Sequence, residues 1–286
     1  MSTEITTAFV EQYKSNVLHL AQQKGSRLRD TVRFESVTGK NFFFERIGAT
    51  AAAKRTTRHS DTPRMDTPHS RRRVSMDDYD WADLIDQEDK VRMLITPQSE
   101  YAMAGANAMG RAMDTSIIEA AVGNAFGGVA GGTTIALPTA QKVVHGSTGL
   151  TVAKLLAAKE IIDSSDVDDE EERCCVLSAG QVTDLLNSTE VKSSDYNTVK
   201  ALAQGQLDTF LGFKFIRSQR LGTDADGNRQ VTVYCRSGIG LALGSDIQTR
   251  ITERDDKNYA TQVFLSMTIG ATRVEDEKVV EIACTE

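Results

Sequence analysis

The clearest periodic pattern along the chain is a stripe of small and apolar residues that begins just after a proline. Thr96 and Pro97 suit the cap and the first position of a helix, and Glu100 places a carboxylate in its first turn. The stripe then continues at spacings of three and four residues through Ala102, Ala106, Met109, Met113, Ile117 and Ala120. The pattern predicts one long helix over 97–122, with a small-residue face that packs along a sheet.

Shorter patterns predict mixed α and β structure on both sides of this helix. The spacing of Phe9, Tyr13 and Val17 predicts a helix near the N-terminus, and alternation predicts two strands around Thr38-Gly39. A strand at 174–177 precedes a helix that Ser178 caps, with Gln181 at its third position. Further helices are expected at 151–162 and around 197–204, and C-terminal strands in "DIQTRITER", "NYATQVFLSMTIGATRV" and "VVEIAC".

The strongest apolar run lies in "AQGQLDTFLGFKFIRSQRL", where Phe213 and Phe215 alternate with Lys214 as in a strand. Asp226-Gly227 predicts a hairpin turn that links this strand to "QVTVYCR". The glycines of "GIGLALG" (238–244) come close to a dinucleotide fingerprint. Their spacing is G-x-G-x-x-x-G and no helix follows, so a glycine turn is the favoured interpretation.

One stretch lacks apolar periodicity altogether. The segment "ATAAAKRTTRHSDTPRMDTPHSRRRVSM" predicts an extended excursion of about thirty residues without a core, a length that usually marks function or disorder. The glycine-rich "GNAFGGVAGGTTIALP" predicts a loop that leads into a strand, and it carries no phosphate-cradling motif.

Charge is unevenly distributed along the chain. Residues 1–76 hold 14 Lys and Arg against 7 Asp and Glu, and the remaining residues hold 19 against 33. Such polarity suits either nucleic-acid binding or contact between the front of one copy and the body of another. Contact with protein is favoured, because no aromatic residues interleave with the arginines of the excursion.

Candidate chemistry is sparse. The four cysteines show no metal-ligand spacing, and Cys174 and Cys175 lie in a run typical of a buried strand. The acidic run at 166–172 is interpreted as a solvated loop rather than a metal site. The sequence therefore predicts no catalytic residue, metal or cofactor, and its apolar runs are too short to span a membrane.

The order of these pieces resembles the major capsid proteins of tailed bacteriophages, which share the Hong Kong 97-like fold. The resemblance covers nearly the whole chain and is strongest in "VLSAGQVTDLLN", "VKALAQGQLDTFLGFKFIRSQRL" and "VYCRSGIGLALGSDIQTRITERDDKNYATQVFLSMTIGATRVEDEKVVEI". It implies an α+β fold and a structural, non-enzymatic protein. Such a protein self-assembles as pentamers and hexamers into the icosahedral shell around a double-stranded DNA genome.

The resemblance also implies how the chain is divided. The implied parts are an N-terminal arm (1–30), an extended loop (31–80), a peripheral domain with the spine helix (81–145), an axial domain (146–246) and C-terminal strands of the peripheral domain (247–286).

The implied partners are other copies of the chain, a portal protein and, as an open option, a decoration or cement protein. Some members begin with a long cleaved helical segment, for which this chain has no room, so a separate scaffolding protein is expected. Contact with packaged DNA is expected to be weak and nonspecific, because the body of the chain is acidic. The expected location is the virion, after assembly in the cytoplasm of the host bacterium.

Under this resemblance the basic loop contacts an acidic surface of a neighbouring copy. The predicted contact residues are Lys54, Arg55, Arg58, Arg64, Arg71, Arg72 and Arg73 on the loop and Asp77, Asp78 and Asp80 on the counter-surface. Reversal of Arg71, Arg72 and Arg73 to glutamate is predicted to block assembly and to leave the monomer folded.

Two other interpretations stay open on the sequence. An encapsulin-like compartment shares the same fold and stores enzymes instead of DNA. An unrelated α/β enzyme would use the thiol of Cys174 or Cys175.

Overall fold

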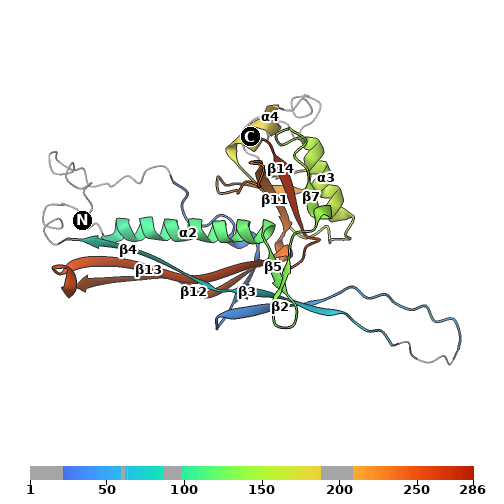
Figure 1. Cartoon of the computed structure of the whole chain (residues 1–286), viewed down its shortest axis with the longest axis horizontal. Coiled ribbons are helices and arrows are strands. Elements are labelled where there is room, and N and C mark those ends of the chain that lie inside the picture. The colour runs from blue at the N-terminus through green and yellow to red at the C-terminus, as the bar shows by residue number, and fades with distance from the viewer. Residues whose placement is uncertain (1–21, 59–61, 63, 87–97, 188–208) are drawn as a thin grey trace.

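The computed structural model describes residues 22–58, 62, 64–86, 98–187 and 209–286 of the chain. The predicted helices near the N-terminus and around 197–204 lie outside these residues, as do Thr96 and Pro97. Figure 1 shows an elongated body that follows helix α2 (Gln98–Val122), a smaller upper unit over one end of it, and a long hairpin that projects from that same end.

A four-stranded sheet forms the floor of the elongated body. Its order is β1–β12–β13–β4, with β1 parallel to β12 and the other pairs antiparallel. The strands are β1 (Arg33–Ser36), β4 (Asp77–Ile85), β12 (Ile239–Arg254) and β13 (Ala260–Arg273). Alternation along β13 buries Val263, Leu265 and Met267 on the face that packs against α2. The predicted C-terminal strands in this region are confirmed.

Helix α2 lies directly on this sheet, as its small-residue stripe predicts. Met109, Met113 and Ile117 of the stripe are buried in the main core. Gly105 permits the close approach, because a Cβ there would lie 2.6 Å from the Trp81 ring and 2.7 Å from Leu265.

The chain before β1 crosses the other side of α2 and is held by one carboxylate. The backbone N–H groups of Arg27 and Leu28 each donate to Asp114 Oδ1 at 3.1 Å. Gly110 makes the crossing close, since a Cβ there would lie 2.4 Å from the carbonyl carbon of Gly25. Short 3₁₀ helices occur here and elsewhere at Arg29–Thr31 (η2), Thr139–Gln141 (η3), Arg236–Gly238 (η4) and Asp255–Lys257 (η5).

A six-stranded sheet of order β7–β14–β11–β8–β10–β9 forms the upper unit with two helices. Helix α3 (Val152–Asp163) packs on β14, and its N-cap Thr151 accepts from the N–H of Lys154. The other elements are α4 (Ala179–Asn187), β7 (Lys142–Val143), β8 (Arg173–Leu177), β9 (Thr209–Phe210), β10 (Phe213–Arg217), β11 (Arg229–Cys235) and β14 (Val279–Cys284). This sheet takes β7 and β14 from either side of the expected axial range 146–246, so that domain division stays a prediction.

The predicted hairpin between β10 and β11 is wrong. Strand β8 lies between them, with Cys175 opposite Phe215 in a parallel pair and opposite Val233 in an antiparallel pair. Asp226-Gly227 does form a turn, with Gly227 at φ 83, but the turn joins only the ends of the connecting loop. All five residues of β8 are buried, so the more apolar strand takes the central position.

The predicted glycine turn at 238–244 is also wrong, because most of this stretch begins strand β12. Gly240 lies under the ring of Phe44, and a Cβ there would come within 2.5 Å of it. The glycine therefore serves close packing within a strand rather than a change of direction.

The third sheet, β2–β3–β5–β6, carries the long hairpin (residues 41–75). Its strands are β2 (Asn41–Ile47), β3 (His69–Ser75), β5 (Ala125–Gly127) and β6 (Thr133–Ile135). The two predicted strands around Thr38-Gly39 are present, but they belong to different sheets. Beyond the bond from Gly48 N to Pro68 O, at 2.8 Å, the described residues of the hairpin are exposed and form no regular helix or strand. The predicted excursion without a core is confirmed for the described residues between Gly48 and Pro68. It is wrong for the end of the predicted segment, because His69–Ser75 form strand β3 and Val74 is buried in a core cluster.

Among the described helices, none is long and apolar enough to cross a membrane.

Candidate inter-subunit surfaces

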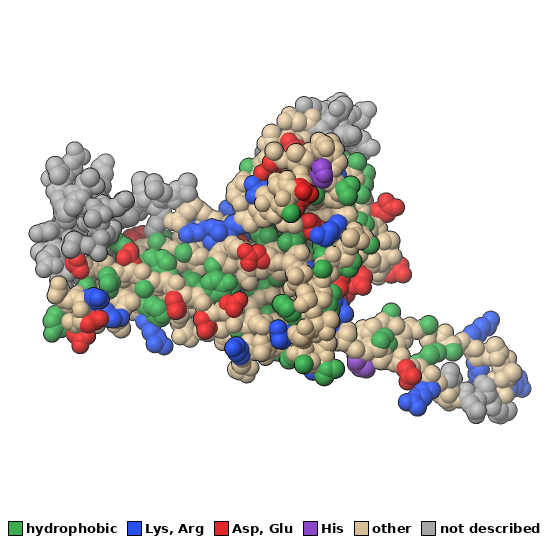
Figure 2. Space-filling model, viewed as in Figure 1, with side chains coloured by type: hydrophobic (Ala, Val, Ile, Leu, Met, Phe, Trp, Pro, Cys, Tyr) green, Lys and Arg blue, Asp and Glu red, His purple; other side chains and the backbone are tan. Residues whose placement is uncertain are grey.

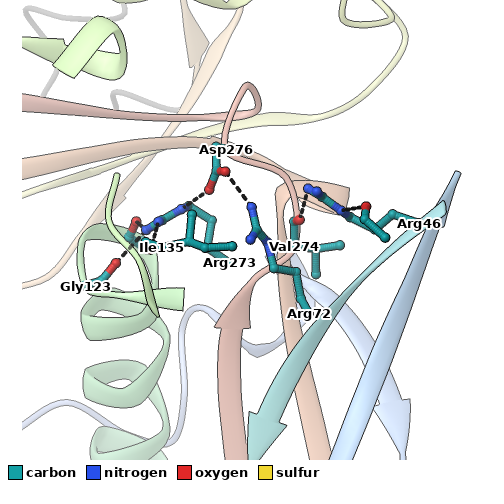
Figure 3. A network of polar contacts seen from close by, with 9 residues as sticks. Arg46, Arg72, Gly123, Ile135, Arg273, Val274 and Asp276 are labelled. Carbon is teal, nitrogen blue, oxygen red and sulfur yellow. Dashed lines mark hydrogen bonds and ion pairs between the residues drawn. The ribbon is translucent and has the colours of Figure 1, made fainter. Parts of the chain in front are cut away.

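The root of the long hairpin is fixed by a buried ion-pair network (Figure 3). Asp276 accepts from two arginines: Arg72 Nη2 lies 2.5 Å from Oδ2, and Arg273 Nε lies 2.6 Å from Oδ1. Arg72 is 3% exposed and Arg273 is fully buried. Desolvation lowers the pKa of Arg72 and the charge of Asp276 opposes that shift. A guanidinium keeps its positive charge in a protein. The buried charges of both arginines are therefore compensated by the carboxylate of Asp276.

Arg273 also connects the network to the end of α2. Its guanidinium donates to the carbonyl oxygens of Gly123 at 2.6 Å, Ile135 at 3.0 Å and Ala121 at 3.1 Å. A cation here satisfies carbonyls that the helix end leaves without intrahelical partners, and it complements the helix dipole. The side chain of Arg273 therefore connects helix α2, the third sheet and the root of the hairpin.

A third arginine and a small apolar cluster hold the other strand of the hairpin, β2. Arg46 Nη1 donates to the carbonyl oxygen of Val274 at 2.7 Å, and its Nε donates to Ser70 Oγ at 3.1 Å. Beneath this contact lies a cluster of Val37, Phe44, Val74, Ala242 and Val274. The hairpin therefore leaves the body in a direction that packing and hydrogen bonds define.

The three consecutive arginines of β3 are not brought together on one surface. Arg72 points into the network. Alternation along β3 places Arg71 and Arg73 on the opposite side of the strand. Arg71 pairs with Glu45 at 2.9 Å and lies over the Phe43 ring, and Arg73 lies over the Phe126 ring. Reversal of all three charges would remove the buried pair of Arg72, so that experiment cannot separate assembly from folding.

The other four predicted basic contacts lie toward the far end of the hairpin. Lys54, Arg55, Arg58 and Arg64 are all exposed. Arg64 lies 3.7 Å from Asp66, but these side chains are 92% and 94% exposed, so the pair contributes little. Figure 2 shows Lys and Arg side chains at the end of the projection. The described part of the tip therefore presents positive charge to solvent.

The three predicted acidic contacts lie on the edge strand β4. Alternation places Asp78 and Asp80 on the open face of the sheet, where Thr268 donates to Asp78 Oδ1 at 2.7 Å. Asp77 lies on the other face, beside Tyr79. Desolvation and the charge of Asp77 raise the pKa of Tyr79. The hairpin tip projects away from β4 in Figure 1, so one chain does not bring the described cations of its own tip onto its own β4.

Sequence reasoning missed Asp276, Arg273 and Arg46. One signal was available for Arg273, which continues the inward alternation of Met267 and Ile269 along β13. A charged residue at a core position predicts a buried partner of opposite charge. Nothing in the sequence pattern identifies Asp276 as that partner.

The four thiols are buried. Desolvation raises the pKa of Cys174 and of Cys235 to about 12 and that of Cys284 to about 11, and it raises the pKa of Cys175 well above its ordinary value. A thiol must be deprotonated to act as a nucleophile, so this environment disfavours the thiol-enzyme interpretation. Within the described ranges, no group of three or more His, Cys, Asp or Glu side chains could hold a metal ion.

Several solved capsid structures share this architecture. The chain is similar to the capsid of cyanophage P-SCSP1u, with a TM-score of 0.74, 18% identity and coverage of 100% of this chain and 96% of that one. It is also similar to the capsid of Ralstonia phage GP4, with a TM-score of 0.76, 12% identity and coverage of 96% and 95%. The capsid of a native GTA particle gives a TM-score of 0.72, 11% identity and coverage of 98% and 96%. The fold is therefore a mixed α and β capsid-subunit fold.

A family model described as phage capsid protein matches residues 5–286. The chain belongs to the phage capsid protein family, and it is a major capsid protein that forms the shell of the virion. Curated protein sequences give no match. The sequence-based resemblance to the major capsid proteins of tailed bacteriophages and the expected α+β fold are confirmed.

Proposed function

We propose that the chain assembles as pentamers and hexamers into a closed icosahedral shell around a double-stranded DNA genome. In this shell the long hairpin lies across a neighbouring subunit. The observation that carries the proposal is the hairpin itself, whose described residues between Gly48 and Pro68 are exposed and lack regular structure. An extended segment without a core gains little from its own chain to offset its loss of conformational entropy. A neighbouring copy would supply the missing contacts.

The rigid root supports this role. Arg72, Arg273 and Asp276 anchor β3, and Arg46 anchors β2, so every copy directs its hairpin alike. A repeated contact between identical subunits requires such a fixed geometry, and many weak contacts act together in a closed shell. The exposed cations at the tip favour a neighbour's acidic surface, for which Asp78 and Asp80 on the open face of the floor sheet are candidates.

We further propose two units within each subunit of this assembly. The floor sheet and α2 form a peripheral unit, and the six-stranded sheet with α3 and α4 forms an axial unit. This axial unit includes β14, which the predicted division placed with the peripheral C-terminal strands (247–286). A separate scaffolding protein directs assembly in the host cytoplasm, and a portal protein occupies one vertex.

Electron microscopy of the expressed chain tests this proposal. The full chain is expressed alone and together with the genes that lie beside it, and purified particles are imaged. We expect closed icosahedral particles with fivefold and sixfold capsomers. A product that remains monomeric under both conditions would contradict the proposal.

A further inference from the structure

A hollow of about 600 Å³ lies against the middle of α2, away from the floor sheet. Its walls come from the segment before η2, from α2, and from the loop that follows β10. Three arginines, three glutamines and Thr115 line it, the arginines being Arg27, Arg111 and Arg220. Figure 2 shows basic side chains in the angle between the elongated body and the upper unit, where α2 lies in Figure 1.

The three arginines are held by neutral acceptors. Arg111 Nη1 donates to Gln22 Oε1 at 2.8 Å, and Arg27 Nη1 donates to the carbonyl oxygen of Arg217 at 2.7 Å. Arg220 Nη1 lies 3.4 Å from Thr115 Oγ1. In the part of the chain that the structure describes, none of the three guanidinium groups pairs with a carboxylate. Each positive charge is positioned by a contact that does not neutralise it.

The carboxylate of Asp114 on α2 accepts a hydrogen bond from Gln23, a residue of the wall, and is already engaged. Asp114 accepts from the N–H groups of Arg27 and Leu28 and from the hydroxyl of Ser26 at 2.5 Å. It is fully buried, so its oxygens serve the chain crossing over α2. The hollow therefore carries a local excess of positive charge on a chain whose net charge is −7.

The composition of the walls distinguishes between two kinds of anionic partner. An acidic protein segment would be expected to meet an apolar centre surrounded by polar groups. No apolar residue lines this hollow in the described part of the chain. Arginine and glutamine side chains suit phosphate groups, which they bind by charge and by hydrogen bonds.

We propose that this hollow binds backbone phosphates of the DNA inside the shell. This inference rests on the proposed function, and it places the α2 side of the subunit toward the lumen. One hollow binds weakly and without sequence preference, because it offers charge and no access to base edges. Repetition over the subunits of a shell gives the lining of the lumen an appreciable total affinity.

Binding of a fluorescent DNA duplex to the full chain, followed by anisotropy over a salt series, tests the site. The test variant is Arg111→Gln with Arg220→Gln. The matched control is Arg236→Gln with Arg250→Gln, which removes two exposed arginines outside the hollow. We expect the test variant to bind more weakly and to lower the salt dependence by about 0.9 per lost phosphate contact, and the control to change little. An equal loss in both variants, or no loss in the test variant, would overturn the proposal.

Two further readouts identify the ligand and separate this inference from the proposed function. Inorganic phosphate at matched ionic strength should compete poorly with DNA, since it offers no neighbouring phosphate; strong competition would make the hollow a site for free phosphate and overturn the DNA assignment. Electron microscopy of the test variant should still find closed shells. If the test variant forms no closed shells but still binds DNA as wild type does, the hollow is a contact between proteins and this inference is overturned. If the test variant forms normal shells and its DNA affinity is unchanged, this inference is overturned and the proposed function stands.

Discussion

At the scale of single residues, Arg71, Arg72 and Arg73 are consecutive but lie in three different environments. Alternation along β3 turns Arg72 into a buried network and leaves its neighbours against Phe43 and Phe126 at the strand surface. The sequence shows only a basic run. What separates the three is the carboxylate of Asp276, which approaches from a distant part of the chain.

Replacement of Asp276 tests the network at the hairpin root. Asp276→Asn would leave Arg72 and Arg273 buried without a counter-charge, and breaking a buried pair in this way costs about 3–5 kcal/mol. We expect a clear fall in the urea midpoint of the unassembled subunit. The matched control is Asp246→Asn, which removes an exposed pair with Arg29 and should cost about 1 kcal/mol or less. Similar small losses in both variants would argue against the network.

The pH dependence of stability has a residue-scale contribution from Glu171. Burial by itself raises the pKa of Glu171, but hydrogen bonds from Ser237 and the charge of Lys278 lower it overall below the ordinary 4.5. A carboxyl with a lowered folded-state pKa stabilises the fold above its unfolded-state pKa, and this stabilisation is lost as the pH falls through the folded value. Glu171→Gln should therefore be less stable than wild type near neutral pH. The difference in urea midpoint should shrink as the pH drops below 4.5, and a pH-independent difference would contradict this account.

At the scale of elements, the sequence predicts best what repeats locally. The long helix and the strands β13 and β14 follow from spacing and alternation. They are present, the helix as Gln98–Val122. Alternation does not specify which strand pairs with which, so the insertion of β8 between β10 and β11 could not be read from it. The glycine turn predicted at 238–244 was wrong for a similar reason. Gly240 packs against Phe44 of another sheet, and a local pattern does not show such a contact.

Gly110 tests the crossing of the N-terminal segment over α2. Gly→Ala inside a helix normally stabilises by about 0.5–1 kcal/mol. At this position the added Cβ would lie 2.4 Å from backbone of Gly25, so Gly110→Ala should instead destabilise, because overpacking costs about 1–3 kcal/mol. Gly180→Ala in α4 is the control, since its nearest neighbour, at 3.1 Å, is the tip of the Glu286 side chain. The unfolding temperatures of both variants are compared with that of wild type, and Gly110→Ala should unfold at a lower temperature. An increase for Gly110→Ala would contradict the close crossing.

At the scale of the whole molecule, the described part of the chain presents three charged surfaces to solvent. The hairpin carries cations outward, β4 carries Asp78 and Asp80 on an open face, and the α2 side carries the basic hollow. The sequence indicates the first two through its charge runs. The hollow could not be predicted from the sequence. Arg27, Arg111 and Arg220 come together only because the segment before η2 crosses α2 and the loop after β10 lies beside it.

The central claim is that the hairpin tip joins one subunit to the next, and particle counts by electron microscopy test it most directly. The test variant reverses the exposed tip charges with Arg55→Glu, Arg58→Glu and Arg64→Glu. The matched control keeps the charge with lysine at the same three positions. Because these side chains are exposed in the single chain, both variants should retain the wild-type circular dichroism and thermal unfolding. We predict closed shells from the lysine variant and unassembled, folded subunits from the glutamate variant; normal shells from the glutamate variant would contradict the account.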